Sequence, residues 1–272
     1  MVRSPLLCLL LIASPAFAQL SPMLLQNDSY WGDGKAEFNI YDAQIVRDGA
    51  PRPGEVLHVL VREPMDPKQP GAGSVLKLNQ ILHLPMGLYV QQQMHSNFWR
   101  VDNGQLLKFS LTSSDSIGNT YKEGRRENAA FTYEYRTAAE SGTEAIVIPE
   151  KGYFYDEVPW LVRTLDFQKP STPVEVQLTG STLNSKKDSF VFKPAKLSFK
   201  STEREIDVAV EHAGGTDHLI LDRNFPNLLR QWNAADGSRL KMKRSLKVAY
   251  WNYNKPGDRE KALADPMLRH PD

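Results

Sequence analysis

The stretch Phe131-Thr132-Tyr133-Glu134-Tyr135-Arg136 decides the fold class, because large apolar side chains alternate strictly with polar ones. Successive side chains of a β-strand point to opposite faces of a sheet, so this stretch places its aromatic rings on one face and its polar groups on the other. The pattern predicts a half-buried antiparallel strand whose aromatic face packs against the core.

The same alternation recurs through the chain. Its apolar sets are Ala36/Phe38/Ile40, Leu57/Val59/Val61, Leu107/Phe109/Leu111, Val174/Val176/Leu178, Ile206/Val208/Val210, Leu240/Met242 and Leu246/Val248/Tyr250. We expect these sets to face the core, and the residues between them, such as Glu37 and Asn39, to lie on the opposite face. The predicted fold class is all-β, with a strongly curved antiparallel sheet that is barrel-like or nearly closed.

One segment has a helical pattern instead. Asp156 is a residue type that caps helices, Pro159 is tolerated in a first turn, and Leu161 and Leu165 are four residues apart. These features predict one short helix near 156–166. The dipeptides Asn103-Gly104 and Asp236-Gly237 predict two tight hairpin turns, because both accept positive φ.

The first eighteen residues have the pattern of a cleaved signal peptide. Arg3 precedes the apolar run Leu6–Ile12, and Ala16-Phe17-Ala18 is a small-x-small cleavage site. We therefore expect the protein to be exported, to the periplasm or outside the cell. Residues 19–272 are expected to form one mostly β domain without a transmembrane span, with a candidate subdivision near 168–173, although one sheet crossing that stretch fits equally well.

Charge and cysteine content exclude several classes. Arg3 is the only charged residue of the signal, so the mature chain would carry equal numbers of basic and acidic residues, which argues against nucleic acid as a partner. Cys8 is the only cysteine and lies in the signal, which excludes a disulfide framework, a cysteine nucleophile and a thiolate metal site. We expect no cofactor and no metal site.

Aromatic clusters are the best candidates for ligand binding. Such rings stack on sugars or line apolar pockets, although they can equally plug the ends of a barrel. The candidate ligand-binding residues are Tyr30, Trp31, Phe98, Trp99, Arg100, Tyr250, Trp251 and Tyr253.

No catalytic residue is assigned, because no serine-hydrolase elbow, phosphate loop, dinucleotide motif or calcium loop is present. His212 and His218 flank Gly214-Gly215, so a hairpin could bring them together as a ligand pair, although strand-end polar positions are the simpler interpretation. The carboxylates that could form a hydrolytic pair are Asp115, Glu134, Asp156 and Glu157.

Two sets of motifs resemble known families. The opening Tyr30-Trp31-Gly32-Asp33-Gly34-Lys35-Ala36-Glu37, with Val75–Asn79, Phe225–Leu229, Trp232, Asp236-Gly237 and Tyr250-Trp251, resembles a family of uncharacterised exported bacterial proteins. More loosely, Arg163-Thr164-Leu165-Asp166-Phe167 after a short helix resembles envelope proteins of unknown function that have an antiparallel barrel-like sheet. These resemblances imply a fold and a compartment but no reaction.

The sequence favours a non-enzymatic envelope protein that binds an apolar or glycan ligand, or another envelope protein or component. One alternative is a hydrolase of cell-envelope polymer that uses a carboxylate pair or His212 and His218. Another is a structural partner that docks through an open strand edge. An apolar interior cavity would favour ligand binding, and titratable groups converging in a cleft would favour the enzyme.

Overall fold

A computed structural model of the chain describes residues 23–66, 68–127, 130–169 and 172–269. The expected signal peptide, residues 1–18, lies outside these ranges. Within them, no helix has both the length and the apolar character needed to cross a membrane.

Strands dominate the structure. They are β1 (Ala36–Arg47), β2 (Ala50–Pro64), β3 (Ser74–Pro85), β4 (Val90–Arg100), β5 (Leu106–Asp115), β6 (Gly118–Glu127), β7 (Ala130–Arg136), β8 (Ser141–Ile146), β9 (Gly152–Phe154), β10 (Val174–Thr179), β11 (Lys193–Ser201), β12 (Glu205–His212), β13 (Gly215–Asp222), β14 (Leu229–Asn233) and β15 (Arg239–Val248). The helices are α1 (Asp28–Trp31), α2 (Val158–Leu161) and α3 (Asp258–Ala264), and the 3₁₀ turns are η1 (Pro70–Ala72), η2 (Tyr155–Glu157), η3 (Val162–Thr164), η4 (Tyr250–Asn252) and η5 (Pro266–Leu268).

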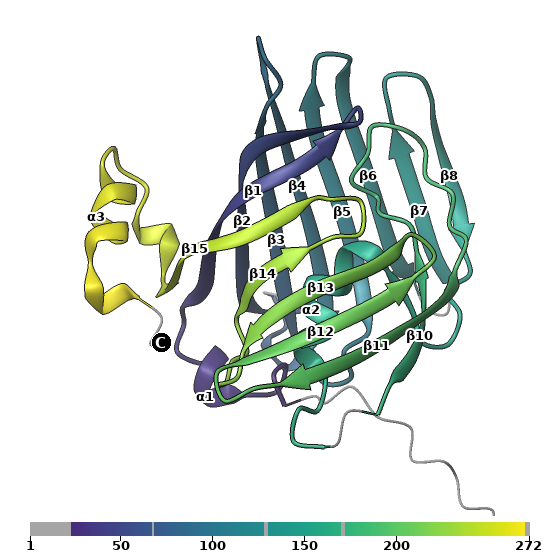
Figure 1. Cartoon of the computed structure of the whole chain (residues 1–272). Helices are drawn as coiled ribbons and strands as arrows, with labels where there is room; N and C mark the ends of the chain where they lie inside the picture. The colour runs from purple at the N-terminus through teal and green to yellow at the C-terminus, as the bar shows by residue number, and fades with distance from the viewer. Residues whose placement is uncertain (1–22, 67, 128–129, 170–171, 270–272) are drawn as a thin grey trace, which may run out of the picture.

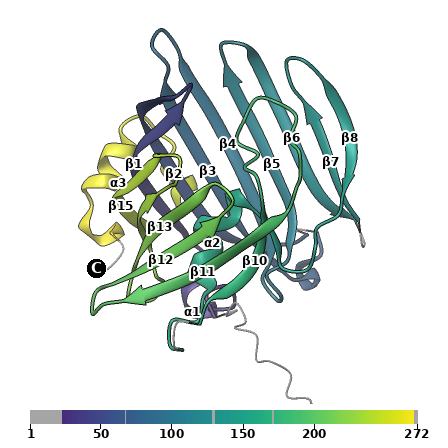
Figure 2. The same cartoon turned by 45° about the vertical axis from the view of Figure 1, so that its right-hand side comes forward.

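The described strands pair into one 15-stranded sheet, in the order β8-β7-β6-β5-β4-β3-β2-β1-β15-β14-β13-β12-β11-β10-β9. Neighbours are antiparallel, except for the parallel pair β9 and β10. The sheet curves so deeply that β3 to β8 form one wall and β10 to β13 the facing wall, with α2 between them (Figures 1 and 2). The predicted all-β, barrel-like fold is confirmed, and the sheet continues on both sides of 168–173.

The sheet is open, because β8 and β9 stand at its two edges. The segment 180–192, between β10 and β11, bridges these edges with its side chains. Lys187 forms an ion pair with Glu144 of β8, and the Phe190 ring lies edge-on to Phe154 of β9, with 5.6 Å between ring centroids. The closure that strand pairing leaves incomplete is thus supplied by side-chain packing.

The predicted helix near 156–166 is present, as α2 between the 3₁₀ turns η2 and η3. It fills the space between the two walls. Val158, Leu161 and Val162 pack in one apolar cluster with β10 to β15, while Trp160 packs in the other, against β3 to β7. The expectation that Asp156 caps the helix is wrong, because it is the Glu157 side chain that accepts a hydrogen bond from the Phe154 N–H, at 2.9 Å.

The inner and outer faces of β1 are the reverse of those expected from the sequence. Glu37 and Asn39 point into the barrel and are buried, whereas Ala36, Phe38 and Ile40 lie on the outer face. The outer residues stay apolar because the C-terminal segment covers them: Tyr250 packs against Phe38, and α3 lies outside the barrel beside β15 (Figure 1). Leu57, Val59, Val61, Leu246 and Val248 belong to the same covered outer face.

The two expected tight turns are longer than predicted. Only the glycines of Asn103-Gly104 and Asp236-Gly237 have positive φ, at 71° and 89°, and the connections run over 101–105 and 234–238. A two-residue turn with positive φ at both residues is found instead at Asp48-Gly49, where the angles are 53° and 73° and Arg47 pairs directly with Ala50. Those angles are characteristic of a type I′ hairpin.

Gly124 of β6 allows the aromatic rings of the interior to stack, and its replacement tests that packing. An added Cβ would lie 2.5 Å from Phe131 Cε1 and closer still to Phe109 Cε1. We expect Gly124→Ala to lower the free energy of unfolding by about 2–3 kcal/mol, the cost of overpacking a core. Urea unfolding measures this loss.

The matched control is Gly180→Ala, since an added Cβ there meets nothing within 4 Å. Its effect should stay within about 0.5 kcal/mol. Equal stabilities for the two variants would contradict the packing described for Phe109 and Phe131.

Candidate functional site

A buried ion pair joins the helical segment to the sheet. The Glu37 carboxylate accepts hydrogen bonds from Arg163 Nη1 and Nη2, both at 2.8 Å, in a bidentate arrangement. Tyr30 Oη and Asn39 Nδ2 also donate to this carboxylate, each at 2.7 Å. Arg163 Nη2 donates further to the Pro226 carbonyl at 3.0 Å, so both charges have several partners.

This pair brings together three segments of the resemblance motifs. Glu37 and Tyr30 come from the opening motif, Arg163 from the segment after the helix, and Pro226 from the β13–β14 connection. Burial pushes the pKa of Glu37 up, but the Arg163 charge and the hydrogen bonds to the carboxylate outweigh it and hold the pKa at about 2. The motifs therefore supply the residues of a buried structural ion pair, the Glu37–Arg163 pair.

A row of inward-facing polar side chains runs across the sheet from the Glu37–Arg163 pair. In consecutive cross-strand register the residues are Ser245, Asn39, His58, Gln80, His95, Leu111 and Lys122, with Leu111 as the apolar member. His58 Nε2 lies 3.2 Å from Gln80 Oε1, and burial lowers the pKa of His58 to about 4. Burial likewise lowers the pKa of His95, so neither histidine carries charge at neutral pH.

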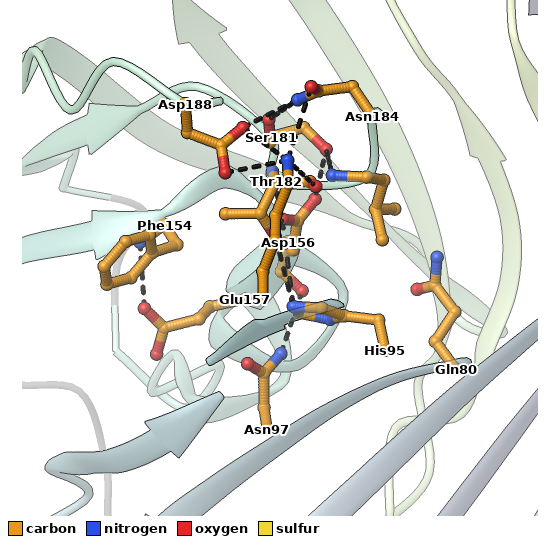
Figure 3. A network of polar contacts seen from close by, with 12 residues as sticks. Gln80, His95, Asn97, Phe154, Asp156, Glu157, Ser181, Thr182, Asn184 and Asp188 are labelled. Carbon is orange, nitrogen blue, oxygen red and sulfur yellow. Dashed lines mark hydrogen bonds and ion pairs between the residues drawn. The ribbon is translucent and has the colours of Figure 1, made fainter. Parts of the chain in front are cut away.

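The far end of the row holds the segment 180–192 in place (Figure 3). Lys122 Nζ is fully buried and donates to the Thr182 carbonyl at 3.0 Å and to Asp188 Oδ1 at 2.9 Å. Asp188 also accepts from Tyr133 Oη, at 2.7 Å, and from Asn184 Nδ2, at 2.7 Å. Through these bonds β6 and β7 fix the position of the segment.

Asp156 fixes the N-terminal end of segment 180–192. Its Oδ2 accepts from the Thr182 N–H at 2.7 Å and from Thr182 Oγ1 at 2.8 Å, and its Oδ1 accepts from Ser181 Oγ at 2.5 Å. Figure 3 shows His95 and Asn97 of β4 beside this group. Both oxygens of the carboxylate are thus occupied by hydrogen bonds within the chain.

Thr182, His95 and Asp156 lack the geometry of a catalytic triad. The Asp156 and Thr182 oxygens both approach the same histidine nitrogen, Nε2, at 4.0 and 3.3 Å. In a triad the acid contacts the other ring nitrogen, and the hydroxyl donates to the histidine. Here the hydroxyl donates to Asp156, and Thr182 has no exposed surface. This network supports structure.

Glu157 is a second buried carboxyl beside the network. It accepts hydrogen bonds from Trp99 Nε1 at 2.6 Å and from the Phe154 N–H at 2.9 Å, and its side chain faces a polar pocket near Arg126 and Lys151. Burial raises its pKa to about 7, against the pull of these hydrogen bonds.

An apolar pocket opens between the two walls of the sheet. Its volume is about 170 Å³, and its lining includes Ile45, Val56, Leu82, Leu183, Trp232, Ala234 and Leu240. Gln80 of the polar row, Asp156 of η2 and Ser181 of segment 180–192 also reach it. The remaining charged residues of the lining are Arg47 at the end of β1, Asp236 in the β14–β15 turn and Arg239 at the start of β15. A mostly apolar wall with a few convergent polar groups is typical of small-molecule sites.

The structure does not bring the predicted aromatic residues to this pocket. Tyr30 and Trp31 pack near the Glu37–Arg163 pair, where Lys247 Nζ lies 4.4 Å from the Tyr30 ring centroid. Trp99 is buried and stacks on Trp160, with 5.5 Å between centroids. The others lie elsewhere: Phe98 and Arg100 at β4, and Tyr250, Trp251 and Tyr253 on the C-terminal segment. Ligand binding by any of them stays a prediction.

The two histidine candidates are also apart. His212 Nε2 lies 3.1 Å from Asp217, whereas His218 Nδ1 lies 3.1 Å from Asp207, so each histidine has its own acidic partner. Among the residues that the structure describes, no group of three His, Cys, Asp or Glu side chains is arranged to hold a metal ion. Of the carboxylate candidates, Glu134 pairs with Arg136, and Asp115 accepts from an N–H of the β5–β6 turn. Asp156 and Glu157 are neighbours, and each carboxyl accepts the separate hydrogen bonds given above.

Sequence reasoning missed the inward row because it placed polar strand positions on the solvent side. One signal was present in Val56-Leu57-His58-Val59-Leu60-Val61, which is apolar on both faces. Such a run indicates a strand covered on both sides, where a lone histidine is buried and needs a hydrogen-bond partner.

Comparisons with known proteins show a distant structural likeness. No protein-family model matches the chain, and no curated protein matches it. The chain is similar to a solved structure described as a beta-barrel-like protein of the domain of unknown function DUF1849 from Brucella abortus, with 10% identity and a TM-score of 0.49, over 78% of this chain and 97% of that chain. The exported family suggested by the opening motif stays a prediction.

The Glu37–Arg163 pair predicts a loss of stability in acid. The folded pKa of Glu37, about 2, lies below its ordinary value of 4.5. The unfolded chain therefore binds more protons between these pH values, and stability present above pH 4.5 is lost as the pH falls towards 2, by about 3 kcal/mol. Urea unfolding at a series of pH values from 5 down to 2 measures it.

The matched control is the double variant Glu37→Gln/Arg163→Met, which removes both charges and should lack this part of the acid loss. Arg163→Met alone leaves a buried carboxylate without its cation and should cost about 3–5 kcal/mol at pH 7. If the unfolding free energy fell equally with pH in the wild type and the double variant, the stabilising role of the Glu37–Arg163 pair would be contradicted.

Glu157 predicts the opposite slope in a separate pH range. Its folded pKa, about 7, lies above its ordinary value of 4.5, so its stabilising contribution is complete below pH 4.5 and is lost as the pH rises through 7. The loss amounts to about 3 kcal/mol. The amide of Glu157→Gln stays neutral at both pH values. The difference between the unfolding free energies measured at pH 4.5 and pH 7.5 should therefore be about 3 kcal/mol smaller in this variant than in the wild type. An unchanged difference would refute the raised pKa.

Proposed function

We propose that this protein is a binding protein of the cell envelope that takes the apolar part of a small ligand into the pocket between the two walls of its sheet. The observation that carries this proposal is the apolar lining of that pocket, with Ile45, Val56 and Leu240 among its wall residues. Burying an apolar chain there releases about 0.8 kcal/mol for each methylene group removed from water.

The size of the pocket fits a short chain or a ring. Its volume of about 170 Å³ is close to that of an engineered cavity of about 150 Å³ that binds benzene. Asp236 and Ser238 of the β14–β15 turn line the pocket, so the ligand would enter from the end of the barrel where the β1–β2 and β14–β15 turns lie. Leu183 makes segment 180–192 one wall of the site.

The apolar class is preferred to the glycan class because the predicted sugar-stacking rings lie outside this pocket. Trp232 and Tyr155 are the aromatic residues that line it, and both donate to Asp217, Trp232 through Nε1 and Tyr155 through Oη. Their polar groups are thus engaged within the protein, which leaves ring surface for the ligand. Export to the periplasm or cell exterior, inferred from residues 1–18, belongs to the same proposal.

A binding role is also preferred to hydrolysis of envelope polymer. The groups that come nearest to a catalytic set, His95, Asp156 and Thr182, are buried and occupied by bonds to one another. Thr182, whose hydroxyl would be the nucleophile of such a set, has no exposed surface. The separate acidic partners of His212 and His218 remove the other candidate pair.

Titration with 1-octanol tests the pocket directly. Trp232 lines it, so its indole N–H signal in a ¹H–¹⁵N NMR spectrum should shift saturably in the wild type. Ala234→Phe places a ring in the same space and should raise the dissociation constant at least about tenfold, since the chain loses the burial of two or more methylene groups.

The matched control is Ala139→Phe, the same substitution at an exposed turn residue outside the pocket lining. It should bind 1-octanol as the wild type does. A wild-type protein without a saturable shift, or an Ala234→Phe variant that binds normally, would refute the proposed function.

A further inference from the structure

We propose that the ligand is an amphiphile with an anionic head group, and that Arg47 at the mouth of the pocket binds this head. The inference rests on the proposed function and adds the chemical class of the ligand. It comes from the hydrogen-bonding state of the four charged residues that line the pocket: Arg47, Arg239, Asp156 and Asp236.

Arg47 is a half-buried cation with most of its donors unused. It stands at the end of β1, and its Nη2 donates to the Leu183 carbonyl at 3.1 Å. Among the described residues, no carboxylate lies within ion-pair distance of its guanidinium, and this is its one side-chain hydrogen bond. A guanidinium has five N–H donors, so Arg47 can form a bidentate pair with a carboxylate or a phosphate.

Arg239 adds a second cation to the same lining. Its side chain is exposed at the start of β15, and within the described part of the chain it forms neither an ion pair nor a side-chain hydrogen bond. Two guanidinium groups with free donors therefore border the pocket.

The two carboxylates of the lining are already satisfied. Asp156 accepts from Ser181 and Thr182, as described above. Asp236 Oδ1 accepts from the Ser238 N–H at 2.7 Å, and its Oδ2 accepts from Ser238 Oγ at 3.1 Å. The formal charges cancel, but the free hydrogen-bonding capacity is on the donor side. A ligand group rich in acceptors and negatively charged complements this arrangement.

The position of Arg47 makes the head group and the chain parts of one ligand. Ile45, two residues earlier on the same strand, and Leu183, whose carbonyl Arg47 contacts, both line the apolar wall. A head group on Arg47 would therefore leave an attached chain directed along these side chains. Fatty carboxylates and monoalkyl phosphates share this design.

Three probes with the same eight-carbon alkyl chain test the inference: nonanoate, octyl phosphate and 1-octanol, each titrated while the Trp232 indole signal is followed. In the wild type at least one anionic probe should bind about fivefold or more tightly than 1-octanol, as expected for charge-assisted hydrogen bonds in a partly buried site. The tighter of the two anions identifies the head group as carboxylate or phosphate.

Arg47→Gln should abolish this preference, because the head group loses its guanidinium partner. A saturable shift with 1-octanol in the same variant shows that the pocket still takes up the alkyl chain. Arg204→Gln, with the same charge change at an exposed turn residue, should keep the preference.

Three outcomes would count against the inference. If 1-octanol binds and neither anion binds more tightly, the anionic head group is refuted and the proposed function stands. If the preference survives in Arg47→Gln, the role of Arg47 is refuted. If none of the three probes gives a saturable shift, the proposed function fails as well.

Discussion

The buried pair of Glu37 and Arg163 is the interaction on which the rest of the structure depends. A deeply curved sheet with two facing walls needs something to fill the space between them, and here that is the helical segment around α2. Apolar packing alone is non-directional and would not fix how the segment sits. The bidentate pair, with Tyr30 and Asn39 completing the carboxylate, gives it one position.

From that fixed segment the interior follows step by step. Asp156, at the start of the segment, holds Thr182, and Lys122 holds the same stretch of 180–192 from the opposite wall. The stretch closes over the open side of the sheet and leaves a pocket where it meets β1, β3 and β15. Because buried polar groups are costly unless hydrogen-bonded, this network specifies one closed arrangement, and the pocket inherits its shape from it.

Alternation of side chains established the strands well, but it did not establish which face is inside. In β1 the apolar residues Ala36, Phe38 and Ile40 lie outside under the C-terminal segment, and Glu37 faces in. A period of two distinguishes the faces of a strand without saying what covers each. The same limit applied to the candidate site. Aromatic residues that are close in sequence, such as Phe98 and Trp99, point to opposite faces of one strand, so sequence proximity did not show which rings lie together.

The sequence by itself determined an all-β chain with a curved antiparallel sheet and one short helix, since these follow from local periodicity and turn chemistry. Only the tertiary structure decided that Glu37 meets Arg163, a contact across 126 residues, and that Arg47 and Trp232 border one pocket. Such contacts depend on strand register and on how far the sheet curves. Both are set by the packing of the whole chain, so no local stretch encodes them.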